Sequence, residues 1–423
     1  MIFLVEIMLG VIVLFEYRNY KIIATPTAVL GGVYFLFIPL INVFGEKLGF
    51  LKIEQRTMIW FTIFVFVLFL SGSVFSVYYN RCLQNRNGER YDLDEKLMRK
   101  EGLIWWSFLF SLICYVISLL QVIQRYGLSN TKSNAFGPFA HIGFLSRCLL
   151  PFIMFYFLRT RKWRYLIAAL VNVVALIMFQ GKYHLYIPIA GFIVLFLVTR
   201  KNISIKKILL AVIGAFAAGI ILFVSVYTII PNVLAGDVSW DSMVEGMYYS
   251  VRHFFHYLFC PFICSNEYFA NPVYRTMEEG VRTNFNAIDT LLQQFVGQRE
   301  FFSPVITLWP RVDTLGTTAN VGGLFSESVL NIGYFYSVLY VAGIGAFVYY
   351  FIVKCLLKGR RIVTAMCLAG TIMMSFFCNY FSLLPNIECL VYSYLFDVFL
   401  LDTKREIKGI SFRKITLKWG KSQ

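Results

Sequence analysis

The chain has 423 residues, of which 58% are hydrophobic and 15% are charged, and its mean hydropathy is +0.67. Soluble domains are about half apolar and carry about 25% charged residues, so this composition excludes a soluble globular protein, a disordered chain, a coiled coil and a disulfide-stapled secreted domain. The net charge is +16, and the basic residues lie between apolar runs. This position favours basic loops that set the orientation of the chain in a membrane over nucleic-acid binding. The sequence predicts a polytopic membrane protein.

Eleven apolar runs come close to the length of about 20 residues that a membrane-spanning helix needs. The first, sixth and seventh runs are short. The predicted spans are 2–16, 23–44, 58–79, 103–123, 138–158, 165–180, 184–199, 208–230, 332–353, 362–384 and 386–402. We therefore predict an all-α fold, with eight spans in residues 1–230 and three spans in 332–402.

The links between these spans predict the orientation of the chain. Three links, 159–164, 200–207 and 354–361, each hold four basic residues and no acid, and the tail 403–423 is also strongly basic. Basic links stay in the cytoplasm, so these segments are predicted to be cytoplasmic. Alternation of the spans then places 17–22 and 80–102 inside, the N-terminus outside and the C-terminus inside.

One predicted external link, residues 231–331, is far longer than the others, and loops of this length usually have structure or function of their own. It holds nine acids before Glu327 and five bases, all of them arginine. Polar residues from Ser242 to His256 recur at spacings of three and four, beside a matching apolar stripe. This pattern predicts an amphipathic helix along the membrane surface, with Arg252 and His256 one turn apart. Such a pair suits an anionic headgroup, and a plain interfacial helix with a snorkelling arginine is the alternative.

Arg147 is the clearest ionisable residue within a predicted span. It lies ten residues into the fifth span, where a charge is costly and usually functional. Because arginine does not deprotonate, it needs an anion. It either pairs with a buried acid such as Glu6, Glu388 or Asp397, or it faces an external cavity and holds a phosphate, which is the interpretation that we favour.

Three further residues lie near predicted external ends of spans. Lys182 lies in the tight link between the sixth and seventh spans, and His184 begins the seventh span. Both residues either lie at the rim of a cavity or are ordinary interfacial residues. Glu327 precedes the ninth span among glycines. It is either a general base aimed at a sugar hydroxyl or a cap of the ninth helix.

No nucleotide-binding or metal-binding motif occurs in the sequence: there is no Walker motif, GxGxxG, HExxH or CxxC pair. No cofactor and no metal are therefore predicted. No internal repeat is visible either, so the repeat-built transporter folds gain no support.

The whole layout, about eleven spans with a large external loop before the last few, resembles the Wzy-type oligosaccharide repeat-unit polymerases of bacterial O-antigen and capsule synthesis. Local likenesses are residues 15–40 (FEYRNYKIIATPTAVLGGVYFLFIPL), the Gly181-Lys182 turn and the loop exit 322–337 (GGLFSESVLNIGYFYS). Relatives often carry arginine at the position of Lys182, and an Asn-Phe-Gly type turn where this chain has Asn331-Ile332-Gly333.

This resemblance implies a GT-C-like membrane glycosyltransferase in the bacterial inner (plasma) membrane. Such enzymes transfer an undecaprenyl-pyrophosphate-linked oligosaccharide to another lipid-linked repeat unit at the external face, without metal or nucleotide sugar. The implied partners are that lipid-linked oligosaccharide, membrane lipid, a chain-length regulator and a flippase. The residues expected to bind the pyrophosphate and glycan are Arg147, Lys182, His184, Arg252 and Arg282, and the catalytic base is expected to be Glu327 or His256. An O-antigen ligase, a flippase or other transporter of lipid-linked oligosaccharide, and a non-enzymatic scaffold are the alternatives.

Overall fold

The computed structural model describes residues 2–86, 89–127, 131, 137–179, 182–200, 239–297, 302 and 308–403, together with scattered residues between 214 and 232. Within these ranges the regular structure is helical, apart from two isolated β-bridges. Six helices are long and apolar enough to cross a membrane, and three shorter apolar helices accompany them. The chain is therefore an all-α, membrane-embedded protein.

The predicted spans correspond to helices with somewhat different bounds. The first half contains α1 (Ile2–Tyr20), α2 (Pro26–Phe44), α3 (Gln55–Gln84), α4 (Leu93–Arg99), α5 (Glu101–Tyr126), α6 (Gly137–Thr160), α7 (Trp163–Met178) and α8 (Lys182–Thr199). The second half contains α11 (Trp240–Ala270), α12 (Met277–Asn284), α13 (Asn286–Phe295), α14 (Gly323–Lys358), α15 (Ile362–Met374) and α16 (Leu384–Phe396). Most of the predicted eighth span, the link 201–207 and the tail 404–423 lie outside the described residues.

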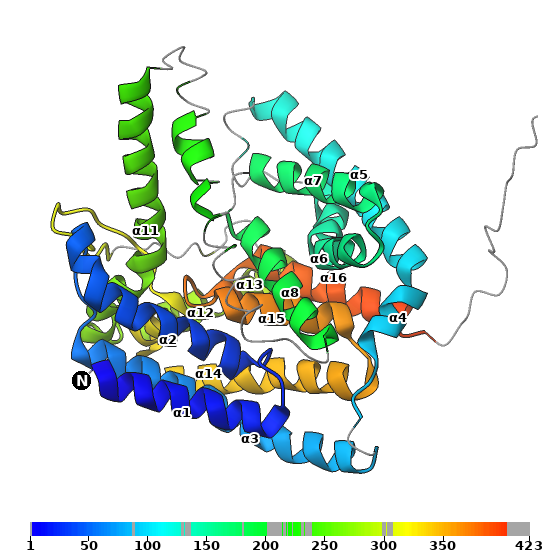
Figure 1. Ribbon diagram of the computed structural model, residues 1–423, viewed down its shortest axis with the longest axis horizontal. Coiled ribbons are helices and arrows are strands. Elements are labelled where there is room, and N and C mark those ends of the chain that lie inside the picture. The colour runs from blue at the N-terminus through cyan, green and yellow to red at the C-terminus, as the bar shows by residue number, and fades with distance from the viewer. Residues whose placement is uncertain are drawn as a thin grey trace, which may run out of the picture.

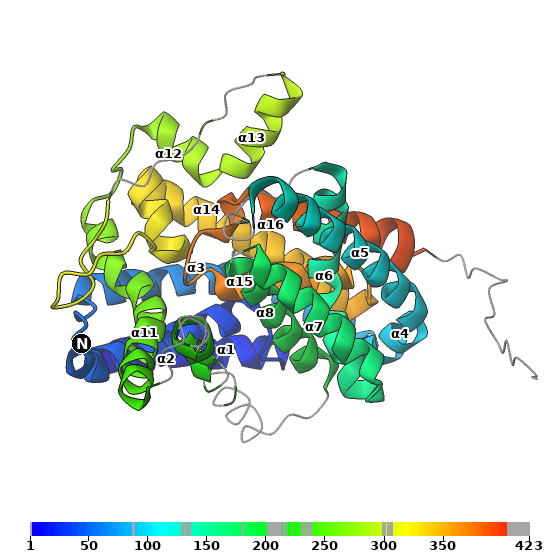
Figure 2. The ribbon, with the colours of Figure 1, turned by 90° about the horizontal axis from the view of Figure 1, so that it is seen from above.

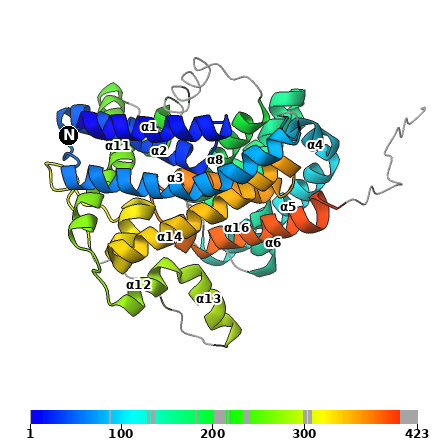
Figure 3. The same ribbon diagram turned by 90° about the horizontal axis from the view of Figure 1, so that it is seen from below.

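Helices α1, α2, α3 and α14 run roughly parallel on one side of the molecule, and α5 to α8 lie on the other side (Figures 1 and 3). Helix α14 packs along α3, and a small residue makes that contact close. The Tyr349 ring of α14 lies against Gly72 of α3, where any Cβ would overlap the ring. The same neighbourhood is tied to α1, because the Tyr20 hydroxyl donates to the Gly72 carbonyl at 2.6 Å.

The links predicted to be cytoplasmic meet at one end of the bundle, which we call the basic end; in the described residues they are 17–22, 80–102, 159–164 and 354–361. Arg90 donates to the Lys21 carbonyl at 2.7 Å, and Arg159 Nε donates to Asp94 at 2.8 Å. The basic link 354–361 joins the same end, since Arg86 donates to the carbonyl of Leu357. The alternation inferred from charge therefore groups these links correctly.

Helix α11 crosses the opposite end of the bundle, where α1 and α14 begin, at a steep angle to both (Figures 1 and 2). It begins after Ser239, whose side chain accepts the Ser242 N–H, and it extends to Ala270, well beyond the predicted amphipathic stripe. Its last three turns carry a run of buried residues from Phe259 to Phe269. The predicted helix is confirmed, but its second half belongs to the core.

One predicted span has the wrong bounds, since α15 ends at Met374 rather than at residue 384. Helix α14 begins at Gly323, but it is kinked at Gly333, whose φ of 73° is not helical, so the kink lies at the predicted start of the ninth span. Residues 375–383 are irregular apart from one short turn, η4 (Tyr380–Ser382). Apolar composition cannot reveal such a break, because irregular backbone is tolerated within a membrane protein where other groups satisfy it. Here the Ser375 carbonyl accepts the Leu324 N–H of α14 at 2.7 Å.

Candidate functional site

Glu327 lies in the second turn of α14, and both of its carboxylate oxygens accept hydrogen bonds. One oxygen accepts the backbone N–H of Gly322 at 3.1 Å, and the other accepts the backbone N–H of Asn379 at 2.9 Å. The Cys378 thiol lies 3.7 Å from the second oxygen. The carboxylate therefore caps its own helix, as one of the two interpretations expects, and it also fastens the irregular segment 375–383. Action of this carboxylate as a base stays a prediction.

Neutral polar side chains surround this carboxylate. The Asn379 amide contacts the Tyr340 hydroxyl of α14 at 3.1 Å and the Asn284 side chain at 3.5 Å. Asn331 of α14 also donates to Asn284, at 3.1 Å. Asn284 is the last residue of α12, so the long link 231–331 contributes directly to the cluster. Helices α12 and α13 lie beside α14 and α16 at this end (Figures 2 and 3).

Arg147 is buried within the bundle, with 2% of its surface exposed. Its Nη1 lies 2.9 Å from Nδ1 of His184 on α8, and its Nη2 donates to Oδ1 of Asn386 on α16 at 2.5 Å. Because a guanidinium only donates, Nδ1 of His184 is the acceptor and this ring is neutral in the arrangement described. The structure thus joins two residues that the sequence analysis placed at different depths.

Two of the acids considered as structural partners of Arg147 are engaged elsewhere. Glu388 lies 3.4 Å from Nδ1 of His141. Asp397 accepts the N–H of Thr364 at 2.8 Å and its hydroxyl at 2.7 Å. The third acid, Glu6, lies on α1, which packs against α2 and α3. The described contacts of Arg147 are therefore with a neutral imidazole and an amide oxygen.

The segment from Ser375 to Asn386 connects the Glu327 cluster with Arg147. Its Asn379 holds Glu327, and its Asn386 accepts from Arg147 while donating to the Tyr380 carbonyl at 3.1 Å. The sequence analysis missed this segment, because it treated 362–384 as one continuous span. The signal was present: Asn379 and the Pro385-Asn386 pair interrupt the apolar run, and polar residues at membrane depth are usually functional.

Two predicted phosphate-binding arginines have carboxylate partners. Arg252 Nη2 lies 2.8 Å from Asp313, whose side chain is almost fully buried, and Arg282 Nη2 lies 3.2 Å from Asp289. Burial alone would raise the pKa of Asp313, but hydrogen bonds from Thr317 and Leu315 together with the Arg252 charge outweigh it and hold this pKa below its ordinary value. These contacts are ordinary ion pairs within the protein, and a role of the two arginines in substrate binding stays a prediction.

His256 and Lys182 are the remaining predicted site residues. The His256 ring lies 6.4 Å from the Phe50 ring, measured between centroids, and the neighbouring Tyr257 stacks on Phe377 of the irregular segment at 6.3 Å. Helix α11 therefore contacts the irregular segment 375–383, whose Asn379 binds Glu327. Lys182 begins α8, but its side chain, like Gly181, lies outside the described residues.

A small cavity of about 10 Å³, about the space that one water molecule needs, adjoins Arg147, with walls that include Pro151, Gly191 and Met366. Among the described residues, no group of three or more histidine, cysteine or acidic side chains is placed to hold a metal ion. No family model, curated protein or solved structure matches the chain. The functional argument therefore depends on the residues of the site.

Proposed function

We propose that the protein is a membrane glycosyltransferase that polymerises undecaprenyl-pyrophosphate-linked oligosaccharide repeat units into O-antigen or capsular polysaccharide, without a metal. One observation carries this proposal. A single segment, 375–386, holds a carboxylate, Glu327, at one end and a buried cation, Arg147, at the other. A base for the acceptor and a cation for the leaving group are the two elements that this transfer requires.

The chemistry uses both groups in one displacement. The acceptor hydroxyl of one repeat unit attacks the anomeric carbon of the other, and Glu327 takes the hydroxyl proton. The new glycosidic C–O bond forms as the bond between the anomeric carbon and the lipid pyrophosphate breaks. Negative charge then develops on the leaving pyrophosphate, and the guanidinium of Arg147 stabilises it electrostatically. His184, which holds one edge of that guanidinium, positions it.

The proposed orientation puts this chemistry on the external face. With the basic end in the cytoplasm under the positive-inside rule, the beginning of α14 and the helices α11 to α13 lie outside. The N-terminus is then external, and the C-terminus is cytoplasmic. A flippase that delivers the substrate and a chain-length regulator are the partners that this assignment requires.

The test uses a bacterial strain that lacks the gene, complemented with the full-length protein or its variants. Size-resolved gels of surface and lipid-linked glycan are the readout. E327Q and R147A should abolish the ladder of long chains while single repeat units still reach the surface, because general-base catalysis alone contributes about 10²–10⁴-fold. E388Q is the matched control, since Glu388 pairs with His141 outside the Glu327 cluster, and it should retain the ladder.

The same gels discriminate the alternatives. Full-length polymer that accumulates on its lipid carrier would identify a ligase. Repeat units that accumulate inside the cell would identify a flippase and would remove Glu327 and Arg147 from catalysis. An R147A protein that is present at normal level, folded and fully active would leave only a scaffolding or unrelated role for that residue.

A further inference from the structure

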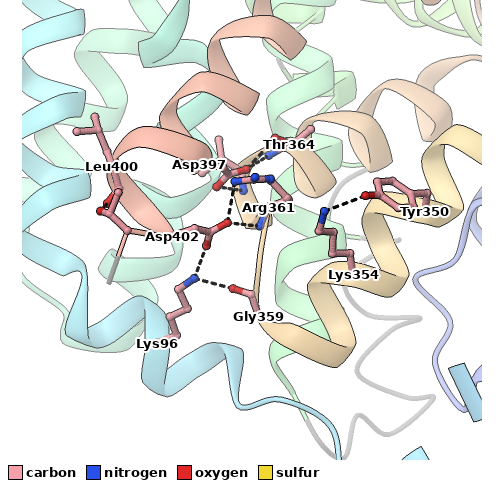
Figure 4. Close-up of polar contacts among 11 residues, drawn as sticks. Lys96, Tyr350, Lys354, Gly359, Arg361, Thr364, Asp397, Leu400 and Asp402 are labelled. Carbon is pink, nitrogen blue, oxygen red and sulfur yellow. Dashed lines mark hydrogen bonds and ion pairs between the residues drawn. The ribbon is translucent and has the colours of Figure 1, made fainter. Parts of the chain in front are cut away.

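A hollow of about 420 Å³ lies at the basic end, and none of the residues assigned above to catalysis lines it. Three chain segments converge on it: the end of α4, the end of α14, and the residues that follow α16 (Figure 4). Its charged lining comprises Lys96, Arg99, Lys100, Lys358, Arg360 and Asp402. Five cations therefore face one carboxylate.

That single carboxylate is already engaged. Asp402 is paired with Lys96 at 2.7 Å and with Arg361 at 3.1 Å, and it also accepts the Arg361 backbone N–H at 3.0 Å. Arg99 has a partner outside the hollow, since it lies 2.5 Å from Glu95. The remaining positive charge of the hollow is not neutralised by Asp402.

Three of the lining cations, Lys100, Lys358 and Arg360, form no ion pair with any acid in the described part of the chain. Their side chains belong to two different segments, so the chain brings like charges together around a concave surface. Like charges that converge in this way repel one another, and a bound anion relieves that repulsion.

Buried contacts hold part of the wall of the hollow in place. Lys96 is fixed by two acceptors, Asp402 and the Gly359 carbonyl at 2.6 Å (Figure 4). Gly359 ends α14 in the left-handed region, with a φ of 59°, and a Cβ there would overlap the Tyr91 ring. Asp397 holds the first turn of α15 through Thr364. The ends of α4, α14 and α16 are thus joined by buried contacts.

We propose that this hollow binds a phosphate-bearing anion at the membrane surface. Several convergent lysine and arginine side chains suit phosphate oxygens, with arginine able to form paired hydrogen bonds and lysine acting as a point charge. Basic pockets between helix ends at the cytoplasmic side are suited to anionic lipid headgroups. The same chemistry fits a free phosphate. The positive-inside rule alone requires basic residues on this side, but it does not require them to converge on one concave site.

The test measures binding by the purified full-length protein in an uncharged detergent, using native mass spectrometry. The probes are phosphatidylglycerol, phosphatidylcholine and inorganic phosphate. The test variant, K358Q/R360Q, removes two exposed charges of the hollow. The control variant, R18Q/R81Q, removes two exposed charges from the same end outside the hollow.

The expected result is that K358Q/R360Q binds phosphatidylglycerol about tenfold more weakly than the parent protein, whereas R18Q/R81Q is nearly unchanged. Binding that inorganic phosphate does not displace identifies a lipid headgroup, and displacement by inorganic phosphate identifies a soluble phosphate anion. Equal losses in the two variants, or equal binding of phosphatidylcholine, would overturn the proposal. If the double variant does not fold, R360Q alone gives the same comparison.

Discussion

Replacing Asp402 by alanine should destabilise the protein much more than a matched change nearby. The Asp402 side chain is 6% exposed, and those of its partners Lys96 and Arg361 are 14% and 16% exposed. The substitution removes the carboxylate from two largely buried cations, and Lys96 then keeps only the Gly359 carbonyl of its two acceptors. Breaking a buried ion pair by removing one partner costs about 3–5 kcal/mol, so we expect a loss of this size.

Asp94 is the matched control, because it also pairs with an arginine at the basic end. Its side chain is 30% exposed and that of Arg159 is 28% exposed, and pairs that solvent screens contribute about 0–1 kcal/mol. The assay is thermal unfolding of the detergent-solubilised full chain. D402N, which keeps the volume and one acceptor oxygen, should fall between D402A and D94A. Equal shifts for D402A and D94A would refute the argument that burial decides the cost.

Two further predictions concern the long link 231–331. G280A should weaken the packing of α12 on α14 by about 1–3 kcal/mol, because a Cβ at Gly280 would overlap the Asn331 carbonyl oxygen, whereas G102A meets open space and should unfold at the parental temperature. The depressed pKa of Asp313 means that its stabilisation is complete above its ordinary pKa of about 3.9 and is lost as the pH falls through its lower folded-state pKa. The acid-induced fall of the melting temperature should therefore be smaller in D313N, and parallel pH curves would contradict the assignment.

Properties that depend on neighbours in the chain could be predicted from the sequence. Apolar runs of membrane length located the apolar helices that the structure describes, with bounds shifted by several residues. The alternating stripes between Ser242 and His256 predicted α11 because helical periodicity is local. The positive charge of the links predicted which loops lie together at the basic end. Glu327, Arg147 and His184 could be singled out as candidates because an ionisable group near or within a span is costly.

Only the tertiary structure decided which of these residues meet. Arg147 contacts His184 and Asn386, which lie 37 and 239 residues away in the chain, and no periodicity relates them. The backbone after Met374, where the helix breaks, is likewise satisfied by Glu327 and Leu324 from another helix. The sequence by itself determined where the apolar helices lie and which links between them are basic, since both follow from local composition. The site depends on contacts between distant segments, and these exist only once the helices have packed.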